Sequence, residues 1–478
     1  MLSKTDRISN CFKRHSMHSL SIFGTSSDAG KSTLSFALTY LCHHRGIKVA
    51  PFKAQNVSNN AQVCDLGGEI AQPQHFAAES IGLPTESDFN PVLLKSGQKN
   101  SASLIVNGQA VGEKDVHAYY RDIDTLKPVV CDAFRRLQKR FELIIAEGAG
   151  SPVELNLMQK DLSNITIAET FENKIILIAD IERGGVFAST WGVYNLLPKA
   201  LQKNVIGVIV NKFRGDITLF DEGITIIEEQ FNLKVLGVVP YRPFNLGFED
   251  AQSLMNYQQE TSATILSVGV IKLPHISNFT DFEPLIADRE VSLEFISTPL
   301  ALSQCDLIII PGSKRVMHDL RWLKEKGFEK LLQDNKRPIL GICGGFEMMF
   351  ETLEERLGIE EKAGTSMQGF SHFQGAVTFE QEKVLKKGAY QIFGCPVEGY
   401  EIHHGKAPHL FLQNAQAYGT FVHGLLESDC FRKKLFTSLK PEYQGYHFKK
   451  YKAQAINDFA QHIDRHVDVD YILKQLDE

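Results

Sequence analysis

The stretch Gly24-Thr-Ser-Ser-Asp-Ala-Gly-Lys-Ser-Thr33 decides the fold of the first half of the chain. The apolar run Leu20–Phe23 comes directly before it, and the helical stretch Leu34–Leu41 follows. A glycine-rich turn between a strand and a helix points backbone N–H groups and a helix N-terminus at an anion. We therefore predict a nucleotide phosphate loop. Five residues separate Gly24 from Gly30 where the standard pattern has four, so an ordinary tight turn is the alternative.

The loop and the strand ends beyond it predict a site for ATP and Mg²⁺. Lys31 is expected to reach the β- and γ-phosphates, and the Ser32 hydroxyl to bind Mg²⁺. Acidic residues that end apolar runs can supply oxygen ligands to the metal, although such residues also cap turns. The predicted nucleotide-binding residues are Gly24, Thr25, Asp28, Gly30, Lys31, Ser32, Thr33 and Asn211, and the predicted metal ligands are Ser32, Glu147 and Asp180. Asn211 is placed to recognise the base, with a turn-forming role as the alternative.

Short apolar runs alternate with amphipathic helical stretches along the whole chain, which predicts an α/β fold of mainly parallel sheets with flanking helices. Continuously apolar runs are typical of strands covered on both faces. The predicted strands are Leu20–Phe23, Val49–Phe52, Leu143–Ala146, Ile175–Ala179, Ile206–Val210, Val235–Val239, Leu266–Ile271, Leu307–Ile310, Ile339–Ile342 and Gly419–Val422.

A second reactive site is predicted around Cys343, in the stretch Pro338-Ile-Leu-Gly-Ile-Cys-Gly-Gly-Phe-Glu347. A buried strand that runs into a glycine-flanked cysteine and then a helix is typical of a nucleophile elbow. The helix N-terminus favours the thiolate, and the adjacent N–H groups can form an oxyanion hole. His423 is the best candidate for the base, and His403 and His404 are alternatives on spacing alone.

The composition points to a cytoplasmic protein without a large nucleic-acid surface. The chain has 478 residues, 43% of them hydrophobic, and a formal net charge of −6, which argues against a large nucleic-acid surface. We expect no membrane span, because no apolar run approaches the roughly 20 residues that one needs. The eight cysteines show no close pairing, so we expect reduced thiols rather than a disulfide framework.

The same pattern predicts two domains. We expect an N-terminal tail at 1–18, a P-loop domain at 19–250, a linker at 251–264, a second domain at 265–440 and a C-terminal helical segment at 441–478. The polar, non-periodic stretch Met255–Thr264 marks the linker. One or two packing helices are expected between Lys449 and Leu476.

The order of these stretches resembles that in the cobyric acid synthase family, over nearly the whole chain from about Ser19. The matching stretches are GTSSDAGKST (24–33), VAPFKAQNVSNN (49–60), NPVLLK (90–95), AEGAGSPVELNL (146–157), ADIERGGVFAS (179–189), VNKFRGD (210–216), LPHISNFTDFEPL (273–285), IIPGSKRVMHDLRWL (309–323), GICGGFEMM (341–349), YEIHHG (400–405) and GTFVHGLLES (419–428). The resemblance implies a dethiobiotin-synthetase-like ATPase followed by a class I-type glutamine amidotransferase. It also implies amidation of the b, d, e and g carboxylates of adenosylcobyrinic acid a,c-diamide, with glutamine, ATP and Mg²⁺. The chain has no haem-type ligand motif, so the corrinoid is expected as a substrate.

The chain departs from the patterns of these families in three places. Leu425 stands where class I amidotransferases usually have Glu, which implies a Cys–His dyad as in the cobyric acid synthases. Glu347 stands where the family has Gln, and a carboxylate there affects both glutamine binding and the thiol. The family's DGGEIGRAQ is replaced by Leu66-Gly-Gly-Glu-Ile-Ala-Gln-Pro-Gln74, with Asp65 one position early.

Three alternatives remain, and only the third arises from these departures. The first is a cobyrinic acid a,c-diamide synthase, which has both domain types. The second is a P-loop protein of the partitioning-ATPase kind, acting as a nucleotide-dependent binding module, for which Cys343 and the second domain would be unnecessary. The third is a divergent paralogue that keeps the fold and has lost one activity.

Overall fold

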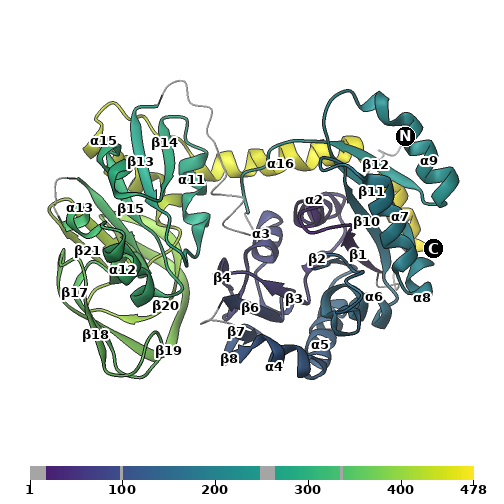
Figure 1. The fold of residues 1–478 in the computed structure, drawn as a ribbon. Helices are drawn as coiled ribbons and strands as arrows, with labels where there is room; N and C mark the ends of the chain where they lie inside the picture. The colour runs from purple at the N-terminus through teal and green to yellow at the C-terminus, as the bar shows by residue number, and fades with distance from the viewer. Residues whose placement is uncertain (1–17, 97–100, 248–263, 334–336) are drawn as a thin grey trace. The chain divides into compact units, whose positions relative to one another are not determined.

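The computed structural model describes residues 18–96, 101–247, 264–333 and 337–478 (Figure 1). All of the expected tail except His18, and all of the expected linker except Thr264, lie outside these ranges. The chain forms two compact units. The first comprises the residues up to Ser58, Gly68–Phe244 and Ala453–Glu478, and the second comprises Asn59–Gly67 and Asn245–Lys452.

The first unit is built on a six-stranded parallel sheet with strand order β12-β11-β10-β1-β9-β2. Its strands are β1 (His18–Gly24), β2 (Val49–Phe52), β9 (Leu143–Glu147), β10 (Lys174–Asp180), β11 (Val205–Phe213) and β12 (Val235–Pro240). All six predicted strands are confirmed. Nearly every residue of β1, β9 and β10 is buried, as expected when helices cover both faces of a parallel sheet.

The helices of the first unit present apolar sides to this sheet. They include α2 (Lys31–His44), α3 (Gln72–Ser80), α5 (Lys127–Gln138), α7 (Val186–Leu196) and α9 (Asp221–Phe231). In α5 the residues Val130, Phe134 and Leu137 recur at helical spacing and are completely buried. Phe134 meets Phe52 of β2 edge to face, with ring centroids 5.0 Å apart, so this face anchors the helix to the sheet.

A small sheet in the first unit was not predicted. It has the order β3-β6-β7-β8, formed by β3 (Gln55–Val57), β6 (Val92–Ser96), β7 (Ser101–Val106) and β8 (Gln109–Asp115). The side chains of β8 are almost all exposed, so its sequence lacks the apolar pattern from which strands are predicted.

The second unit contains a six-stranded sheet with the order β14-β13-β15-β16-β22-β21. Its strands are β13 (Leu266–Ile271), β14 (Val291–Ile296), β15 (Leu307–Ile310), β16 (Ile339–Ile342), β21 (Phe411–Asn414) and β22 (Ala417–Thr420). All pairings are parallel except that of β21 with β22. Four of these strands were predicted, but the last, predicted as Gly419–Val422, ends at Thr420.

A second sheet in this unit, with the order β18-β17-β19-β20, was also missed. It consists of β17 (Phe350–Glu355), β18 (Thr365–Gln368), β19 (Phe373–Ile392) and β20 (Cys395–Lys406). The long hairpin of β19 and β20 alternates buried and exposed side chains only in part, and much of β19 is charged. An irregular register between Phe379 and Val384 further breaks its period.

The two units divide the chain differently from the expected boundaries. The C-terminal helices α16 (Phe448–His466) and α17 (Val469–Asp477) agree with the expected helical segment. However, the residues from Ala453 onward belong to the first unit, where the Asp468 N–H donates to Leu236 O at 2.8 Å. The stretch Asn59–Gly67 belongs to the second unit, where Asn278 Nδ2 donates to Ala61 O at 2.6 Å.

The expectation that all cysteines are reduced is wrong for one pair. Cys395, at the start of β20, forms a disulfide with Cys430 in α15 (Asp429–Leu439), 35 positions later. The sequence could not reveal this pair because the hairpin that brings β20 against α15 was not predicted. The other described cysteines, among them Cys343, are buried and are not part of a disulfide. Within the described ranges no helix is long and apolar enough to cross a membrane.

Candidate nucleotide and glutaminase sites

The predicted phosphate loop lies between β1 and α2, in the strand–loop–helix arrangement that its sequence predicts. The backbone of Asp28 and Gly30 is left-handed, with φ of 55° and 96°. A Cβ atom on Gly30 would lie 2.2 Å from Asn211 Nδ2, so only glycine fits there. Asn211 Nδ2 also donates to Ala29 O at 2.9 Å. Asn211 therefore stabilises the loop through its hydrogen bond to Ala29, and its recognition of a base stays a prediction.

Lys31 and Ser32 begin the helix that follows the loop. Lys31 Nζ donates to Ser26 O at 3.1 Å, so the ammonium curls back over its own loop. The Thr33 hydroxyl donates to Gly30 O at 3.0 Å. Thr25 is held in line with the sheet by its N–H, which donates to Ile178 O at 2.8 Å. An ammonium and a helix N-terminus at one loop form an arrangement suited to a polyphosphate.

Glu147 is the centre of a buried polar cluster that includes Ser32, at the end of the loop. Its Oε1 accepts from Ser32 Oγ and from Lys53 Nζ, both at 2.7 Å, and its Oε2 accepts from Gln74 Nε2 at 3.1 Å. Lys53 and Gln74 were not predicted as site residues. Lys53 lies in a stretch that carried the family resemblance, whereas Gln74 lies in the stretch that departs from the family pattern. A hydroxyl and a carboxylate oxygen this close form a donor set that suits Mg²⁺.

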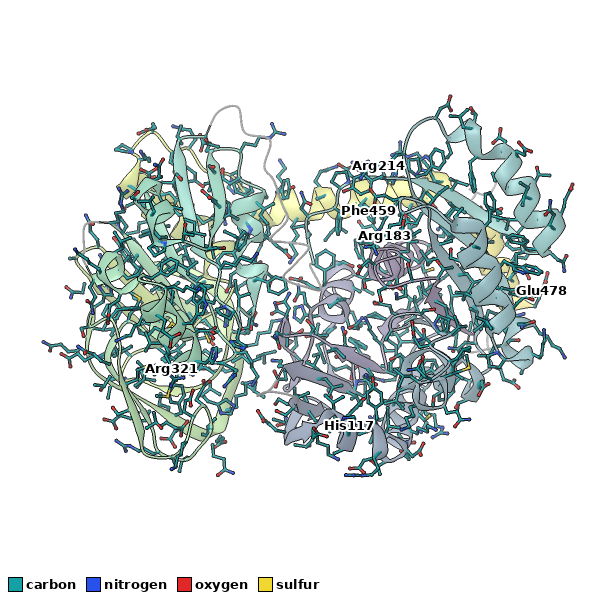
Figure 2. The ribbon with its side chains drawn as sticks, viewed as in Figure 1. His117, Arg183, Arg214, Arg321, Phe459 and Glu478 are labelled. Atoms are coloured by element: carbon teal, nitrogen blue, oxygen red, sulfur yellow. A yellow bond between two sulfur atoms is a disulfide. The ribbon has the colours of Figure 1, made fainter. Side chains whose placement is uncertain are left out.

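Asp180, the third predicted metal ligand, is engaged differently. Its Oδ2 forms an ion pair with Lys212 Nζ at 3.0 Å, and its Oδ1 accepts the Glu182 N–H at 2.8 Å. Asp28 is exposed and pairs with Arg183 at 3.3 Å. Arg214 pairs with Glu182 and lies 3.7 Å over the ring of Tyr241; both arginines are labelled in Figure 2. The structure thus brings Ser32 and Glu147 together and gives Asp180 a different partner.

The segment that departs from the family pattern is divided between two environments. In the first unit Glu69 forms a buried ion pair with Lys95 at 2.6 Å, and Gln74 joins the Glu147 cluster. In the second unit Asp65 pairs with Lys387 of β19 at 2.9 Å. Asp65 therefore has a partner within the second unit.

Cys343 has the strained backbone expected of a nucleophile elbow. Its φ and ψ are 51° and −111°, between β16 and the short helix α14 (Gly344–Glu347). The flanking glycines are required by close approach, because a Cβ atom on Gly345 would lie 1.9 Å from Ile310 O. The Cys343 N–H already donates to Thr420 O at 2.7 Å, so an oxyanion hole needs other amides.

His423 is fixed in one orientation by a carboxylate. It is fully buried, and its Nδ1 lies 2.7 Å from Asp281 Oδ2, while Asp281 Oδ1 accepts the Gly424 N–H at 2.7 Å. Its ring stacks on Tyr400 with centroids 5.1 Å apart. Within the described chain, His423 Nε2 has no partner at hydrogen-bonding geometry, which leaves this nitrogen for the nucleophile.

The electrostatics of His423 link it to Cys343. Burial lowers the pKa of His423, but the charges of Asp281 and of the Cys343 thiolate outweigh burial and raise this pKa to about 10. His403 and His404 are engaged elsewhere, with Gly405 O at 2.7 Å and with Glu380 O at 3.0 Å. The geometry thus favours His423 over both alternatives.

Asp281 is the main residue that the sequence analysis missed. The absence of a carboxylate at Leu425 predicted a dyad, whereas Asp281 approaches the histidine from a stretch 142 positions earlier. It belongs to Ser277-Asn-Phe-Thr-Asp-Phe-Glu-Pro-Leu285, which contributed strongly to the resemblance but had been given no role.

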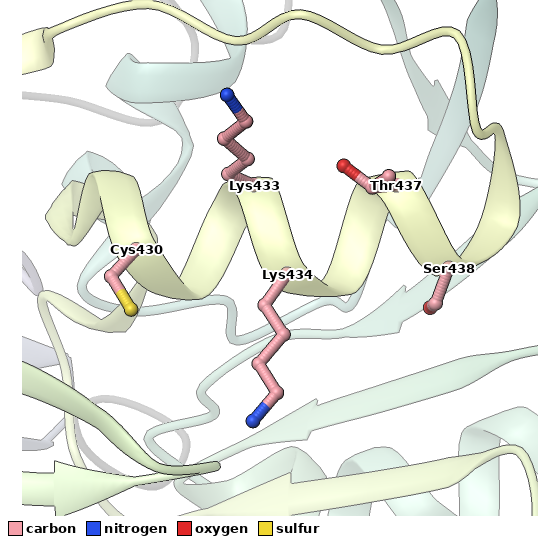
Figure 3. Close-up of a pocket in the computed structure, with 5 residues that line it drawn as sticks. All are labelled: Cys430, Lys433, Lys434, Thr437 and Ser438. Atoms are coloured by element: carbon pink, nitrogen blue, oxygen red, sulfur yellow. The ribbon is translucent and has the colours of Figure 1, made fainter.

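Two other features contain none of the predicted site residues. His275, His318 and Asp319 form a cluster in which Asp319 accepts from His275 Nδ1 and Ser313 Oγ, both at 2.7 Å, so these bonds already account for its carboxylate. A pocket along α15 is lined by Cys430, Lys433, Lys434, Thr437 and Ser438 (Figure 3). None of the predicted site residues lines this pocket.

Two protein-family models match this chain, one over most of the residues of each unit. The CobQ/CobB/MinD/ParA nucleotide binding domain matches residues 20–246, and the CobB/CobQ-like glutamine amidotransferase domain matches residues 267–431. Among solved structures, a glutamine amidotransferase covers 36% of this chain and 97% of its own, at 13% identity and a TM-score of 0.28. The signal recognition particle receptor FtsY from Elizabethkingia anophelis covers 50% of this chain and 66% of its own, at 13% identity and a TM-score of 0.30. At these TM-scores, the two matches support no conclusion about the fold or the function of this chain.

Curated relatives match nearly the whole chain. A cobyric acid synthase from Acinetobacter baylyi is 52% identical over 97% of this chain and 100% of its own length. A cobyric acid synthase from Salmonella enteritidis PT4 is 34% identical over 94% of this chain and 96% of its own. The chain is therefore an α/β enzyme of the glutamine-dependent amide ligase type, and it belongs to the cobyric acid synthase family.

Proposed function

We propose that this chain converts the b, d, e and g side-chain carboxylates of adenosylcobyrinic acid a,c-diamide into amides, giving adenosylcobyric acid. Glutamine supplies the nitrogen and ATP the activation. The observation that carries the proposal is the alignment of Cys343, His423 and Asp281 in a chain that also has a phosphate loop. Carboxylate amidation needs a source of ammonia and a means of activating the carboxylate, and a glutaminase site and a nucleotide site would supply these.

The glutaminase half follows from the geometry of the three residues. Asp281 binds the Nδ1–H of His423, which leaves Nε2 to take the proton of the Cys343 thiol and form an imidazolium. The Cys343 thiolate attacks the glutamine carboxamide, and His423 gives its proton to the leaving nitrogen. Ammonia departs and a γ-glutamyl thioester remains, which water cleaves to glutamate. The raised pKa of His423 favours the imidazolium before glutamine arrives.

The ligase half uses the loop before α2. A carboxylate is a poor electrophile, so it attacks the γ-phosphorus of ATP and becomes an acyl phosphate, while ADP leaves. Lys31 and the loop amides neutralise charge on the phosphates. Ser32 and Glu147 would hold Mg²⁺, which when bound supplies positive charge beside the phosphates. Ammonia then attacks the acyl carbon and phosphate departs.

The proposal is tested by measuring glutamate release and the mass of the corrinoid in the same tubes, with and without ATP and Mg²⁺. Wild-type protein should release glutamate and add amides to adenosylcobyrinic acid a,c-diamide. Cys343→Ala should abolish glutamate release but still amidate the corrinoid when ammonium is supplied. Amidation of cobyrinic acid at its a and c positions would identify an a,c-diamide synthase instead. If neither nitrogen source gave turnover, a divergent paralogue would be the better interpretation.

A further inference from the structure

Glu347 lies one helical turn after the nucleophile, and no basic side chain in the described ranges forms an ion pair with it. Its backbone N–H donates to Cys343 O at 3.0 Å, which fixes it on the short helix α14. Its side chain is 1% exposed. Within the described residues, Glu347 Oε2 finds no hydrogen-bond partner. Ionising a buried carboxyl group that has an oxygen without a hydrogen-bond partner is strongly unfavourable, so this environment favours the protonated acid.

The neighbours of Glu347 make ionisation still less favourable. Its carboxyl packs against Gly405 of β20, where an added Cβ would lie 2.5 Å from both Cδ and Oε1. The titratable groups that act on it are Cys343 from its own turn and Glu360 from the segment after β17, and both are acids. The cations Lys314 and Arg315 act on Glu360. Burial and the two acids together raise the pKa of Glu347 well above its usual range.

We propose that Glu347 is held as a neutral carboxylic acid beside Cys343, and that its ionisation sets the alkaline limit of glutamine hydrolysis. This inference rests on the proposed glutaminase function. A protonated carboxyl offers one O–H donor and one C=O acceptor, and therefore resembles the amide that the family has at this position. Glu347 is a positioning residue: when neutral it tolerates the thiolate of Cys343, and when ionised it repels that thiolate.

The alkaline limit has a competing explanation, because His423 also loses its proton near its pKa of about 10. Replacing Glu347 distinguishes the two causes. Glu347→Gln keeps the size and hydrogen-bonding groups but cannot ionise, and Glu347→Met cannot ionise and has no amide. Glu351→Gln is the matched control, since it removes the same charge from an exposed site on β17.

The experiment combines pH profiles of glutamate release, pH profiles of Cys343 alkylation by iodoacetamide, and infrared difference spectra against wild type. We expect the spectra to reveal a protonated-carboxyl band at pH 7 that is missing from Glu347→Gln and Glu347→Met and retained in Glu351→Gln. The alkaline limits of hydrolysis and of alkylation should move in both Glu347 variants by about one pH unit or more. Glu347→Gln should retain turnover near neutral pH, and Glu347→Met should have a lower kcat.

Unchanged alkaline limits in both Glu347 variants, or the absence of the protonated-carboxyl band from wild type, would overturn the inference. Failure of the proposed function looks different. In that case Cys343→Ala and wild type would release glutamate equally, while the infrared band and the alkylation profile would still report on Glu347. If Glu347→Gln fails to fold, Glu347→Met provides the same test, because it also removes the ionisable group.

Discussion

His423 Nδ1 lies 2.7 Å from Asp281 Oδ2, and this contact completes a Cys–His–Asp arrangement for which the sequence had supplied only two members. The same carboxylate accepts the Gly424 N–H at 2.7 Å, so it fixes both the tautomer of the imidazole and the backbone that carries it. A carboxylate with these two bonds orients the base and stabilises the imidazolium. Asp281 is thus, with Cys343, one of the two residues whose charge raises the pKa of His423.

Asp281→Asn should reduce kcat for glutamine hydrolysis by about 10²- to 10⁴-fold, because an amide cannot stabilise the imidazolium and can favour the wrong tautomer. Glutamate release from purified protein is the measurement. Glu283→Gln is a control on the same segment, outside the hydrogen bonds to His423. A loss of less than threefold for Asp281→Asn would mean that the dyad alone is sufficient.

The ion pair should also make stability depend on pH. The pKa of His423 is raised from 6.5 to about 10 in the folded protein. Its contribution to the free energy of unfolding is therefore fully present below pH 6.5 and is lost as the pH rises through about 10. Urea denaturation at pH 7 and pH 10 should give a smaller difference between wild type and Asp281→Asn at the higher pH. A difference that grows with pH would contradict the assigned direction.

Glu147→Gln should disable the ligase half and spare the glutaminase half. It leaves Lys53 buried without its carboxylate and removes the negative charge from the oxygen that accepts from Ser32 Oγ. Breaking one partner of a buried ion pair costs about 3–5 kcal/mol, so the first unit should melt earlier. ATP-dependent amidation with ammonium should be lost, whereas glutamate release should persist. Glu142→Gln, one strand length earlier and at the surface, is the control.

The features that were predicted correctly from the sequence are those that depend on residues close together in the chain. The β1–loop–α2 unit and the β16–Cys343 turn were found because an apolar run, a glycine-rich turn and a helix are contiguous in the chain. Asp281 was missed because its contact with His423 spans 142 positions, and Lys53 because its partner Glu147 is 94 positions away. A single sequence does not show which distant carboxylate or ammonium group pairs with a given buried side chain.

The strands that were missed have a related explanation. β8 and much of β19 expose their side chains, and the hydrophobic periodicity that identifies a buried strand is absent there. The disulfide between Cys395 and Cys430 was missed for the same reason, because it depends on the position of the β19–β20 hairpin. The replacement of Gln by Glu347 was visible in the sequence. Its burial, from which we infer a neutral carboxylic acid, was visible only in the structure.

Gly30→Ala should damage the nucleotide site beyond the ordinary cost of its backbone conformation. Gly30 has φ +96°, and a Cβ there would lie 2.2 Å from Asn211 Nδ2, whereas Gly46 has φ +84° with nothing within 4 Å. Gly46→Ala should therefore lose only about 1–2 kcal/mol of stability, the cost of a left-handed alanine. Gly30→Ala carries the same cost and must in addition displace Asn211 and the loop it supports. We expect the KM for ATP in ammonium-dependent amidation to rise at least about tenfold in Gly30→Ala, and to stay unchanged in Gly46→Ala. Equal effects of the two substitutions on this KM would mean that the contact of Asn211 with the loop does not shape the nucleotide site.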